Sequence, residues 1–302
     1  MMINQSIDYT THIGHVALNT GNLKQMIVFY NTILGFTILK QTDRTAILGT
    51  LTNLPLLILT EVDHAIPRTN VETGLDHFAI LLPTRKELSR HFQWIVDHNY
   101  PISIIADHMV NESFYIHDPD DNLIEFTRDF TSEEQIGRRP NSSASLGQIL
   151  STRSGVIKSH LISPETRIGH VLLRVSSLEE AERFYTQVIG LKVSMRMNGA
   201  VFVAAGDYHH HLGFHVWETL NGEKPSYSTI GLRYFTVQVP SQGSFIEIRD
   251  KLQDRYKASQ LEKRIIGLRD PSGNGIFLTS SYGSKLEEAS EIDGFFESLG
   301  ND

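Results

Sequence analysis

Two ten-residue stretches of this sequence are close copies that differ at one chemically important position. GLDHFAILLP occupies residues 74–83 and holds His77, whereas GLRYFTVQVP occupies residues 231–240 and holds Tyr234 at the same place. An imidazole can ligate a metal or move a proton near neutral pH, whereas a single tyrosine is a poor ligand for a divalent metal. His77 is therefore a candidate for chemistry that the second copy lacks.

A run of histidines forms a second group of residues that could do chemistry. It lies in GDYHHHLGFHVW (206–217), where alternation along a strand would place His209 and His211 on one face. The sequence contains no cysteine. Disulfides, thiolate metal sites, iron–sulfur clusters and thiol nucleophiles are therefore excluded.

The composition predicts a soluble, cytoplasmic protein of two ordinary domains. The chain has 302 residues, of which 40% are hydrophobic, and its formal net charge is −8. Basic residues form no block or stripe that would bind nucleic acid or an anionic membrane. The N-terminal residues lack the pattern of a secretory signal, and no apolar run reaches the roughly 18–20 residues that a membrane span needs.

The elements that must position these residues repeat along the chain. Residues 12–39 match residues 167–194, and the openings near residues 74 and 231 resemble both, which gives four modules. Each module opens with a short strand, continues with an amphipathic helix and ends in short β-branched runs separated by turns such as DPDDN and DPSGN. In the third module, a capping box begins the helix at Ser177 and Gly190 ends it. The predicted class is α+β, with four βαβββ modules.

The modules form two halves of the sequence. Modules 1 and 2 lie in residues 8–130, a polar linker occupies 131–165, modules 3 and 4 lie in 166–283, and a C-terminal tail occupies 284–302. A linker of that length could let modules pair across the middle of the chain. Both consecutive pairing and pairing of module 2 with module 3 therefore remain open.

Three motifs together carry a resemblance to a known family. GHV at a strand start, GLDHFAILLP and the closing DPDDNLIEF resemble the vicinal oxygen chelate superfamily, which includes glyoxalase I, bleomycin-resistance proteins and extradiol dioxygenases. The resemblance covers nearly the whole chain outside the linker. The four-module length is most similar to two-domain catechol 2,3-dioxygenases, followed by hydroquinone ring-cleavage enzymes. It implies that modules pair into two cupped-sheet, glyoxalase-like domains.

The resemblance also implies a metal site. Family ligands come from the first strand of each module and the last strand of one, positions that hold His77 and Glu125 in module 2 but Tyr234 and Phe277 in module 4. The third ligand would be His170 if modules 2 and 3 pair, or His15 if modules 1 and 2 pair. The histidine run of module 3 favours the set His77, Glu125 and His170.

The expected activity is extradiol ring cleavage of a catechol or hydroquinone by O₂ in aromatic catabolism. Two histidines and one carboxylate suit Fe(II), and the same ligands would hold Mn(II). The run ADHMVNESFY resembles a dioxygenase motif and implies that His108 and Tyr115 orient the diol. His211 is the expected base or charge stabiliser, although the choice among residues 209–211 stays open. The exposed strand edges of this fold often form homodimers.

Two other functions remain as alternatives. One is a glyoxalase-like lyase or isomerase with Ni(II) or Zn(II), which would need a further carboxylate from the partner module. The last strand of module 1 offers only Glu61, at its end, and module 3 offers His and Phe there. The other is a metal-free resistance protein that binds an aromatic ligand. A buried, unpaired Glu125 would be costly in such a protein.

Overall fold

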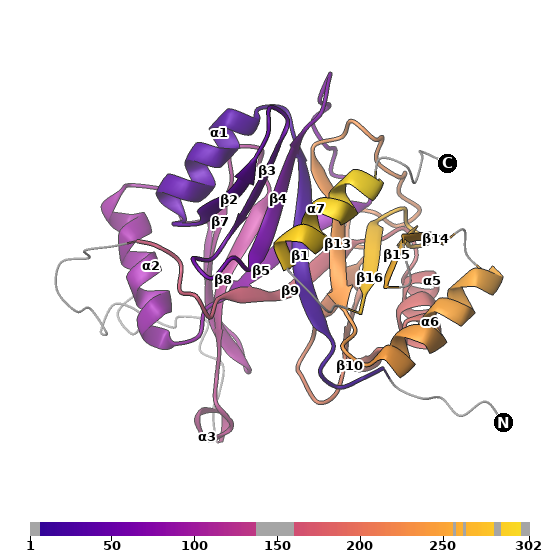
Figure 1. The fold of residues 1–302 in the computed structure, drawn as a ribbon. Helices are drawn as coiled ribbons and strands as arrows, with labels where there is room; N and C mark the ends of the chain where they lie inside the picture. Colours follow the sequence, from indigo (N-terminus) through magenta and orange to yellow (C-terminus); the bar gives the residue numbers. More distant parts are fainter. Residues whose placement is uncertain (1–6, 137–159, 256–257, 262–263, 281–284, 297–302) are drawn as a thin grey trace.

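The computed structural model describes residues 7–136, 160–255, 258–261, 264–280 and 285–296. Most of the predicted linker lies outside these residues. The protein consists of two eight-stranded sheets with helices packed against them (Figure 1). The α+β class and the four βαβββ modules are therefore confirmed. No helix in these described ranges is long and apolar enough to cross a membrane.

The elements follow the four repeats. Modules 1 and 2 contain β1 (His12–Thr20), α1 (Leu23–Val28), the π-helical turn η1 (Phe29–Ile33), β2 (Thr37–Gln41), β3 (Thr45–Gly49), β4 (Pro55–Glu61), β5 (Gly74–Leu81), α2 (Arg85–Asp97), β6 (Ile104–Asp107), β7 (Asn111–His117) and β8 (Leu123–Asp129), followed by α3 (Ser132–Gln135). Modules 3 and 4 contain β9 (Arg167–Arg174), α5 (Leu178–Arg183), the π-helical turn η2 (Phe184–Val188), β10 (Lys192–Met197), β11 (Ala200–Ala204), β12 (Leu212–His215), β13 (Gly231–Gln238), α6 (Gln242–Arg255), β14 (Ser259–Leu261), β15 (Ile265–Arg269) and β16 (Gly275–Thr279), followed by α7 (Lys285–Phe296).

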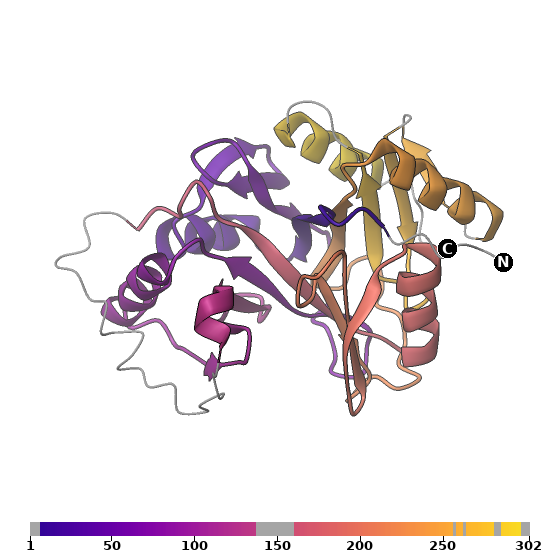
Figure 2. The same cartoon turned by 90° about the horizontal axis from the view of Figure 1, so that it is seen from below.

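Each sheet combines strands from both halves of the sequence. The first sheet has the order β14-β15-β16-β13-β1-β4-β3-β2 and joins modules 1 and 4. The second has the order β10-β11-β12-β9-β5-β8-β7-β6 and joins modules 2 and 3. Figure 2 shows the two sheets side by side, with α2 and α5 at opposite ends of the molecule. The sheets therefore do not coincide with the two halves of the sequence.

Local signals explain where the helices begin and end. Thr84 and Ser177 are N-caps whose side chains accept the backbone N–H of Glu87 and Glu180. In modules 1 and 3 the helix ends in a π-helical turn just before Gly35 or Gly190. Gly35 has a φ of 76°, and a Cβ there would come within 2.0 Å of the carbonyl oxygen of His160. Only glycine fits both the conformation and the space.

The DPDDN and DPSGN turns tie the two sheets together. One oxygen of Asp118 accepts the backbone N–H of Asn122 at 2.8 Å, and the other accepts the Tyr30 hydroxyl at 2.8 Å. Asp270 accepts the Tyr185 hydroxyl at the same distance. Because Tyr30 belongs to module 1 and Asp118 to module 2, these bonds link modules that lie in different sheets.

A bulge interrupts the central strand pair of each sheet. In the second sheet Leu75 lies opposite Leu173 and His77 opposite Leu172, which leaves Asp76 as the extra residue. In the first sheet Arg233 is skipped in the same way. A bulge turns its extra side chain to a direction that regular alternation would not allow. Asp76 and Arg233 thus occupy equivalent, special positions.

Helix α7 covers the inner face of the first sheet (Figure 1). Tyr234 and Phe277 form a buried cluster there with Ala289, Ile292 and Phe296 of the helix. The buried Arg233 donates to Asp293 at 3.2 Å and lies 4.5 Å above the Phe296 ring. The side chains on this face of the sheet thus pack against helix α7.

Replacement of Asp293 by Ala tests how much this helix depends on Arg233. The change leaves a buried guanidinium without its carboxylate, and it should lower the free energy of unfolding by about 3 kcal/mol. Urea denaturation measures the loss. Glu291→Ala, at an exposed position of the same helix, is the control and should change stability little. Equal effects of the two changes would contradict a role for the Arg233–Asp293 pair.

Candidate metal centre

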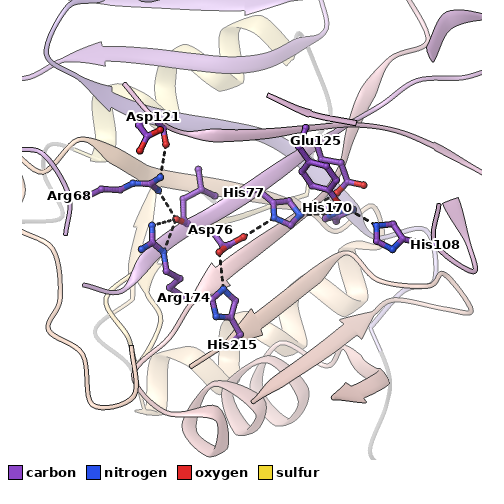
Figure 3. A network of polar contacts seen from close by, with 11 residues as sticks. Arg68, Asp76, His77, His108, Asp121, Glu125, His170, Arg174 and His215 are labelled. Carbon is purple, nitrogen blue, oxygen red and sulfur yellow. Dashed lines mark hydrogen bonds and ion pairs between the residues drawn. The ribbon is translucent and has the colours of Figure 1, made fainter. Parts of the chain in front are cut away.

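Three side chains converge where β5, β8 and β9 meet in the second sheet. His77 Nε2 lies 3.3 Å from Glu125 Oε2 and 3.3 Å from His170 Nε2, and His170 Nε2 lies 2.9 Å from Glu125 Oε2. The side chains come from β5, β8 and β9 in turn (Figure 3). Among the described parts of the chain, these residues form the single group of three or more that could hold a metal ion.

The spacing of these atoms fits a metal. Ligands with bonds of ~2.1 Å on neighbouring corners of an octahedron lie about 3.0 Å apart, close to the observed 2.9–3.3 Å. Glu125 and His170 are 1% and 3% exposed, and the second oxygen of Glu125 has no hydrogen-bond partner. A buried carboxylate needs a counter-charge. Two imidazoles and one carboxylate on one face leave further coordination positions open.

Asp76 holds His77 in the orientation that a metal ligand needs. Its Oδ1 accepts from His77 Nδ1 at 2.8 Å, and its Oδ2 accepts from His215 Nε2 at 3.0 Å. His215 is fully buried and stacks on Trp217, with ring centroids 4.2 Å apart. Because Nδ1 of His77 carries the donated proton, its Nε2 lone pair is free for a metal. Figure 3 shows Asp76 between the two imidazoles.

Charge within the cluster shifts the pKa of each group. Burial raises the pKa of Glu125, but the charge and hydrogen bonds of His170 and His77 outweigh it and hold this pKa well below its ordinary value. Burial lowers the pKa of His77, whereas hydrogen bonds to Asp76 and Glu125 raise it to about 9. The Glu125 carboxylate is therefore stabilised as an anion by the two neighbouring imidazoles. A bound cation could take the place of the protons on these imidazoles.

The equivalent position in each module shows that a single carboxylate faces the site. Glu125 on β8 lies opposite Ala79, two residues after His77. The same register places Gly213 opposite Leu172, two residues after His170. A Cβ on Gly213 would approach Leu172 Cδ1 to 2.4 Å. Strand β12 therefore offers no ligand at this position, and a side chain there would have to displace Leu172.

The first sheet carries apolar residues at the equivalent positions. Phe277 lies opposite Thr236 and Ile58 lies opposite Ala17. His15, the alternative third ligand, belongs to this sheet, where its ring meets Tyr234 at a centroid distance of 5.8 Å. The structure thus brings His170, and not His15, next to His77 and Glu125.

Tyr115 and His108 lie beside the three-residue cluster. The Tyr115 ring meets His77 edge-on at a centroid distance of 5.5 Å, and its hydroxyl lies 3.5 Å from His108 Nε2. Burial and the charge of Glu125 raise the pKa of Tyr115, so its hydroxyl keeps its proton. His108 is exposed, in the turn between β6 and β7. Tyr115 therefore lies next to His77, and His108 lies beyond it at an exposed position.

The histidine run is arranged differently from the prediction. Residues 209–211 lie in the loop before β12 rather than within a strand. The His210 ring lies against His170, with centroids 4.3 Å apart. His211 instead packs on Tyr208 at 4.6 Å and accepts the backbone N–H of Ala205 through Nδ1 at 3.2 Å. Because the loop does not alternate like a strand, the middle histidine faces the cluster.

Three supporting residues escaped the sequence analysis. Asp76 and His215 orient His77, and Asp129 accepts from His209 Nε2 at 3.0 Å. Asp76 directly precedes His77, so its position gave a signal, but only the bulge turns both side chains toward the site. His215 and Asp129 lie on other strands and showed no pattern of their own.

The chain is similar to several known proteins. The family model "Glyoxalase/Bleomycin resistance protein/Dioxygenase superfamily" matches residues 12–126 and 167–277. The chain is similar to a catechol-2,3-dioxygenase of Bacillus subtilis (strain 168), at 35% identity over 91% of this chain and 98% of that protein.

Two solved structures share the fold. One is a Bacillus subtilis protein provisionally titled a dioxygenase, with a TM-score of 0.65 and 13% identity over 94% of this chain and 88% of that chain. The other is glyoxalase I of Zea mays, with a TM-score of 0.55 and 15% identity over 97% of this chain and 98% of that chain. At these identities the likeness shows the fold alone.

Single substitutions test the ligand set. His77→Ala, Glu125→Ala and His170→Ala should each abolish the retention of one divalent metal per chain, because two remaining ligands hold a metal weakly. His15→Ala removes the equivalent histidine of the first sheet and should leave the metal content unchanged. Elemental analysis of anaerobically purified protein measures the ratio. Loss of metal in His15→Ala but not in His170→Ala would place the centre elsewhere.

Replacement of Asp76 by Asn tests whether the hydrogen bond from His77 to Asp76 supports metal binding. The variant keeps all three ligands but weakens the hold on the His77 ring, so metal affinity should fall roughly 10–100-fold. Competition with a chelator of known affinity measures the change. Asp43→Asn, at an exposed position, is the control. Equal affinities of the two variants would show that the bond from His77 to Asp76 has no influence on the centre.

Proposed function

Because the chain belongs to the glyoxalase/bleomycin resistance protein/dioxygenase superfamily, we propose that it is an extradiol dioxygenase. In this proposal His77, Glu125 and His170 hold Fe(II), and the substrate is a catechol- or hydroquinone-type diol. O₂ opens the ring, and both of its oxygen atoms enter the product. The bound iron supplies Lewis acidity toward the diol and a site for O₂ activation.

The observation that carries the proposal is the donor set, with two histidines and one carboxylate on one face. Gly213 occupies the position where a second carboxylate would have to stand, so module 3 contributes no carboxylate there. Three protein ligands leave room for two diol oxygens and O₂. A glyoxalase-like lyase or isomerase would need a further protein ligand, so this geometry favours the dioxygenase.

The name of the similar Bacillus subtilis protein points to the same reaction class. A relative at 35% identity that matches 91% of this chain supports ring cleavage of a diol.

His210 is better placed than His211 to move protons during the reaction. Its ring lies against the proposed ligand His170, whereas His211 faces away on Tyr208. Burial is the larger cause, and the charges of His170 and His209 the smaller, that lower the pKa of His210 well below its ordinary value. A neutral imidazole at this place could accept a proton from the diol or donate a hydrogen bond to developing negative charge.

Tyr115 and His108 are suited to orient the diol. The Tyr115 hydroxyl remains protonated beside the cluster and can donate to a substrate oxygen. His108 is exposed and within 3.5 Å of that hydroxyl, so it can contact a substrate from the open side. Together they would fix which oxygen approaches the metal.

Oxygen uptake by the iron-loaded protein tests the reaction. Addition of catechol or methylhydroquinone should cause diol-dependent O₂ consumption and a yellow ring-opened product. The same protein loaded with Zn(II) should consume no O₂. If iron fills the site but neither diol nor its alkyl derivatives cause O₂ uptake, the dioxygenase proposal fails.

Substitutions of His210 and His211 distinguish a role in proton transfer from a role in packing. His210→Phe should lower kcat about 10²–10⁴-fold, the usual range for loss of a general acid or base. His211→Phe should keep most of the activity, because its ring contacts Tyr208 and not the cluster. Metal content is measured in parallel to show that both variants keep iron. The reverse order of effects would restore His211 to the role expected from the sequence.

A further inference from the structure

Two arginine side chains meet at the β-bulge that precedes His77. Arg68 donates through Nη1 to the carbonyl oxygen of Leu75 at 2.9 Å. Arg174 donates to the same oxygen through Nε at 3.2 Å and through Nη2 at 3.0 Å. Figure 3 shows both guanidinium groups converging beside Asp76. Neither arginine is a candidate ligand, and the proposed reaction leaves both without a role.

The two arginines connect the three strands that carry the candidate metal ligands. Arg174 ends β9, the strand of His170, and reaches across to β5, the strand of His77. Arg68 also donates through Nη2 to the carbonyl oxygen of Asp121 at 2.6 Å. Asp121 lies in the turn that leads into β8, the strand of the carboxylate ligand. One carbonyl oxygen of β5 is therefore tied both to β9 and to the start of β8.

Arg174 differs from the other buried arginines of the described residues in its partners. Arg128 pairs with Glu112 at 2.8 Å, and Arg233 pairs with Asp293 at 3.2 Å. Arg174 is 8% exposed, and no carboxylate oxygen of the described residues lies within 4.0 Å of its guanidinium nitrogens. A buried charge without a close counter-charge is costly. Ion pairing therefore does not explain why an arginine occupies this position.

The two guanidinium groups also repel each other. Burial lowers the pKa of Arg68, and the positive charge of Arg174 lowers it further. The charges of Asp121, Asp118 and Asp76 act in the opposite direction. Two like charges that share one carbonyl oxygen add less to the stability of a fold than two separate ion pairs would. The arrangement therefore indicates a local role at the bulge.

The first sheet differs at the position that matches Arg174. Asn19 lies opposite Gly231 in the pair of β1 and β13, as Arg174 lies opposite Gly74 in the pair of β9 and β5. The Asn19 side chain donates to two carbonyl oxygens of the loop before β13, at 2.9 Å and 3.2 Å. The contact from this position to the carbonyl before the bulge thus occurs in the sheet that carries the candidate ligands.

The contacted oxygen belongs to the peptide group with which the bulge begins. The carbonyl of Leu75 and the N–H of Asp76 lie in one planar unit, so a held oxygen fixes the direction in which the chain enters Asp76. The Asp76 carboxylate then accepts from His77 Nδ1 at 2.8 Å. Without the arginine contacts, this peptide group could rotate and move the His77 ring relative to Glu125.

We propose that Arg68 and Arg174 form a clamp that positions His77 for metal binding. The clamp consists of these two side chains and their shared bond to the Leu75 carbonyl, and it acts on His77 through Asp76. Both arginines are positioning residues, because neither reaches the ligand atoms. The inference rests on the metal centre of the proposed function, but it does not depend on the reaction that the metal supports.

Co(II) affinity of the full-length protein, measured by competition with a chelator, tests the clamp. Arg174→Met removes both bonds to Leu75 and should weaken Co(II) binding roughly tenfold, as is usual for the partners of metal ligands. Arg174→Lys can still donate one bond and should lose less. Arg68→Met should weaken binding several-fold. Asn19→Ala, at the matching position of the first sheet, should bind Co(II) like the parent, with circular dichroism confirming that each variant is folded.

A double substitution shows whether the clamp acts through Asp76. In the Asp76→Asn background, Arg174→Met should lower Co(II) affinity by less than about threefold more, because the path from the clamp to His77 is already broken. Independent structural effects would instead multiply. At saturating Co(II), the visible absorption bands should shift in Arg174→Met and stay unchanged in Asn19→Ala, since the clamp alters the orientation of a ligand.

Two results would overturn the clamp. One is parent-like Co(II) affinity and absorption in Arg174→Met, and the other is the full effect of Arg174→Met in the Asp76→Asn background. In both cases the parent protein still binds Co(II). A parent protein that binds no Co(II) would contradict the metal centre itself, and with it both the clamp and the proposed function.

Discussion

The antiparallel pairing of β5 with β9 is the interaction on which the candidate metal centre depends. It places His77 opposite Leu172 and Ala79 opposite His170, so two histidines that lie 93 residues apart reach one point. Strand β8 then pairs with β5 and brings Glu125 to the same face. A shift by a single residue in either pairing would turn one ligand to the outer face of the sheet. The register therefore defines the centre.

The same framework gives opposite results in the two sheets. The bulge position holds Asp76 in one and Arg233 in the other, and the next residue is His77 or Tyr234. Asp76 directs an imidazole toward Glu125, whereas Arg233 binds Asp293 of a helix that packs over the apolar face. The second sheet therefore carries a cluster of ionisable side chains. The equivalent face of the first sheet is covered by helix α7.

Burial of the ionisable cluster in the second sheet favours binding of a cation, and it also costs folding free energy. Glu125 and His170 are almost entirely withdrawn from water, where a charged group is stable only with close partners. Asp76 and His215 satisfy the outer nitrogen of His77, while one oxygen of Glu125 remains without a partner. Such an arrangement is held in place by the surrounding sheet and becomes fully satisfied when a cation binds.

The sequence by itself determined the four modules, because hydrophobic periodicity, capping residues and the repeated GHV and GLDHF motifs are local signals. It also selected His77 and Glu125, and it excluded thiol chemistry. Only the tertiary structure decided that module 2 pairs with module 3, which brings His170 rather than His15 to the cluster. It likewise placed His210, not His211, beside His170, since the direction of a loop side chain depends on packing that no periodicity encodes. Pairing register and loop geometry are set by contacts between distant residues, so local pattern cannot fix them.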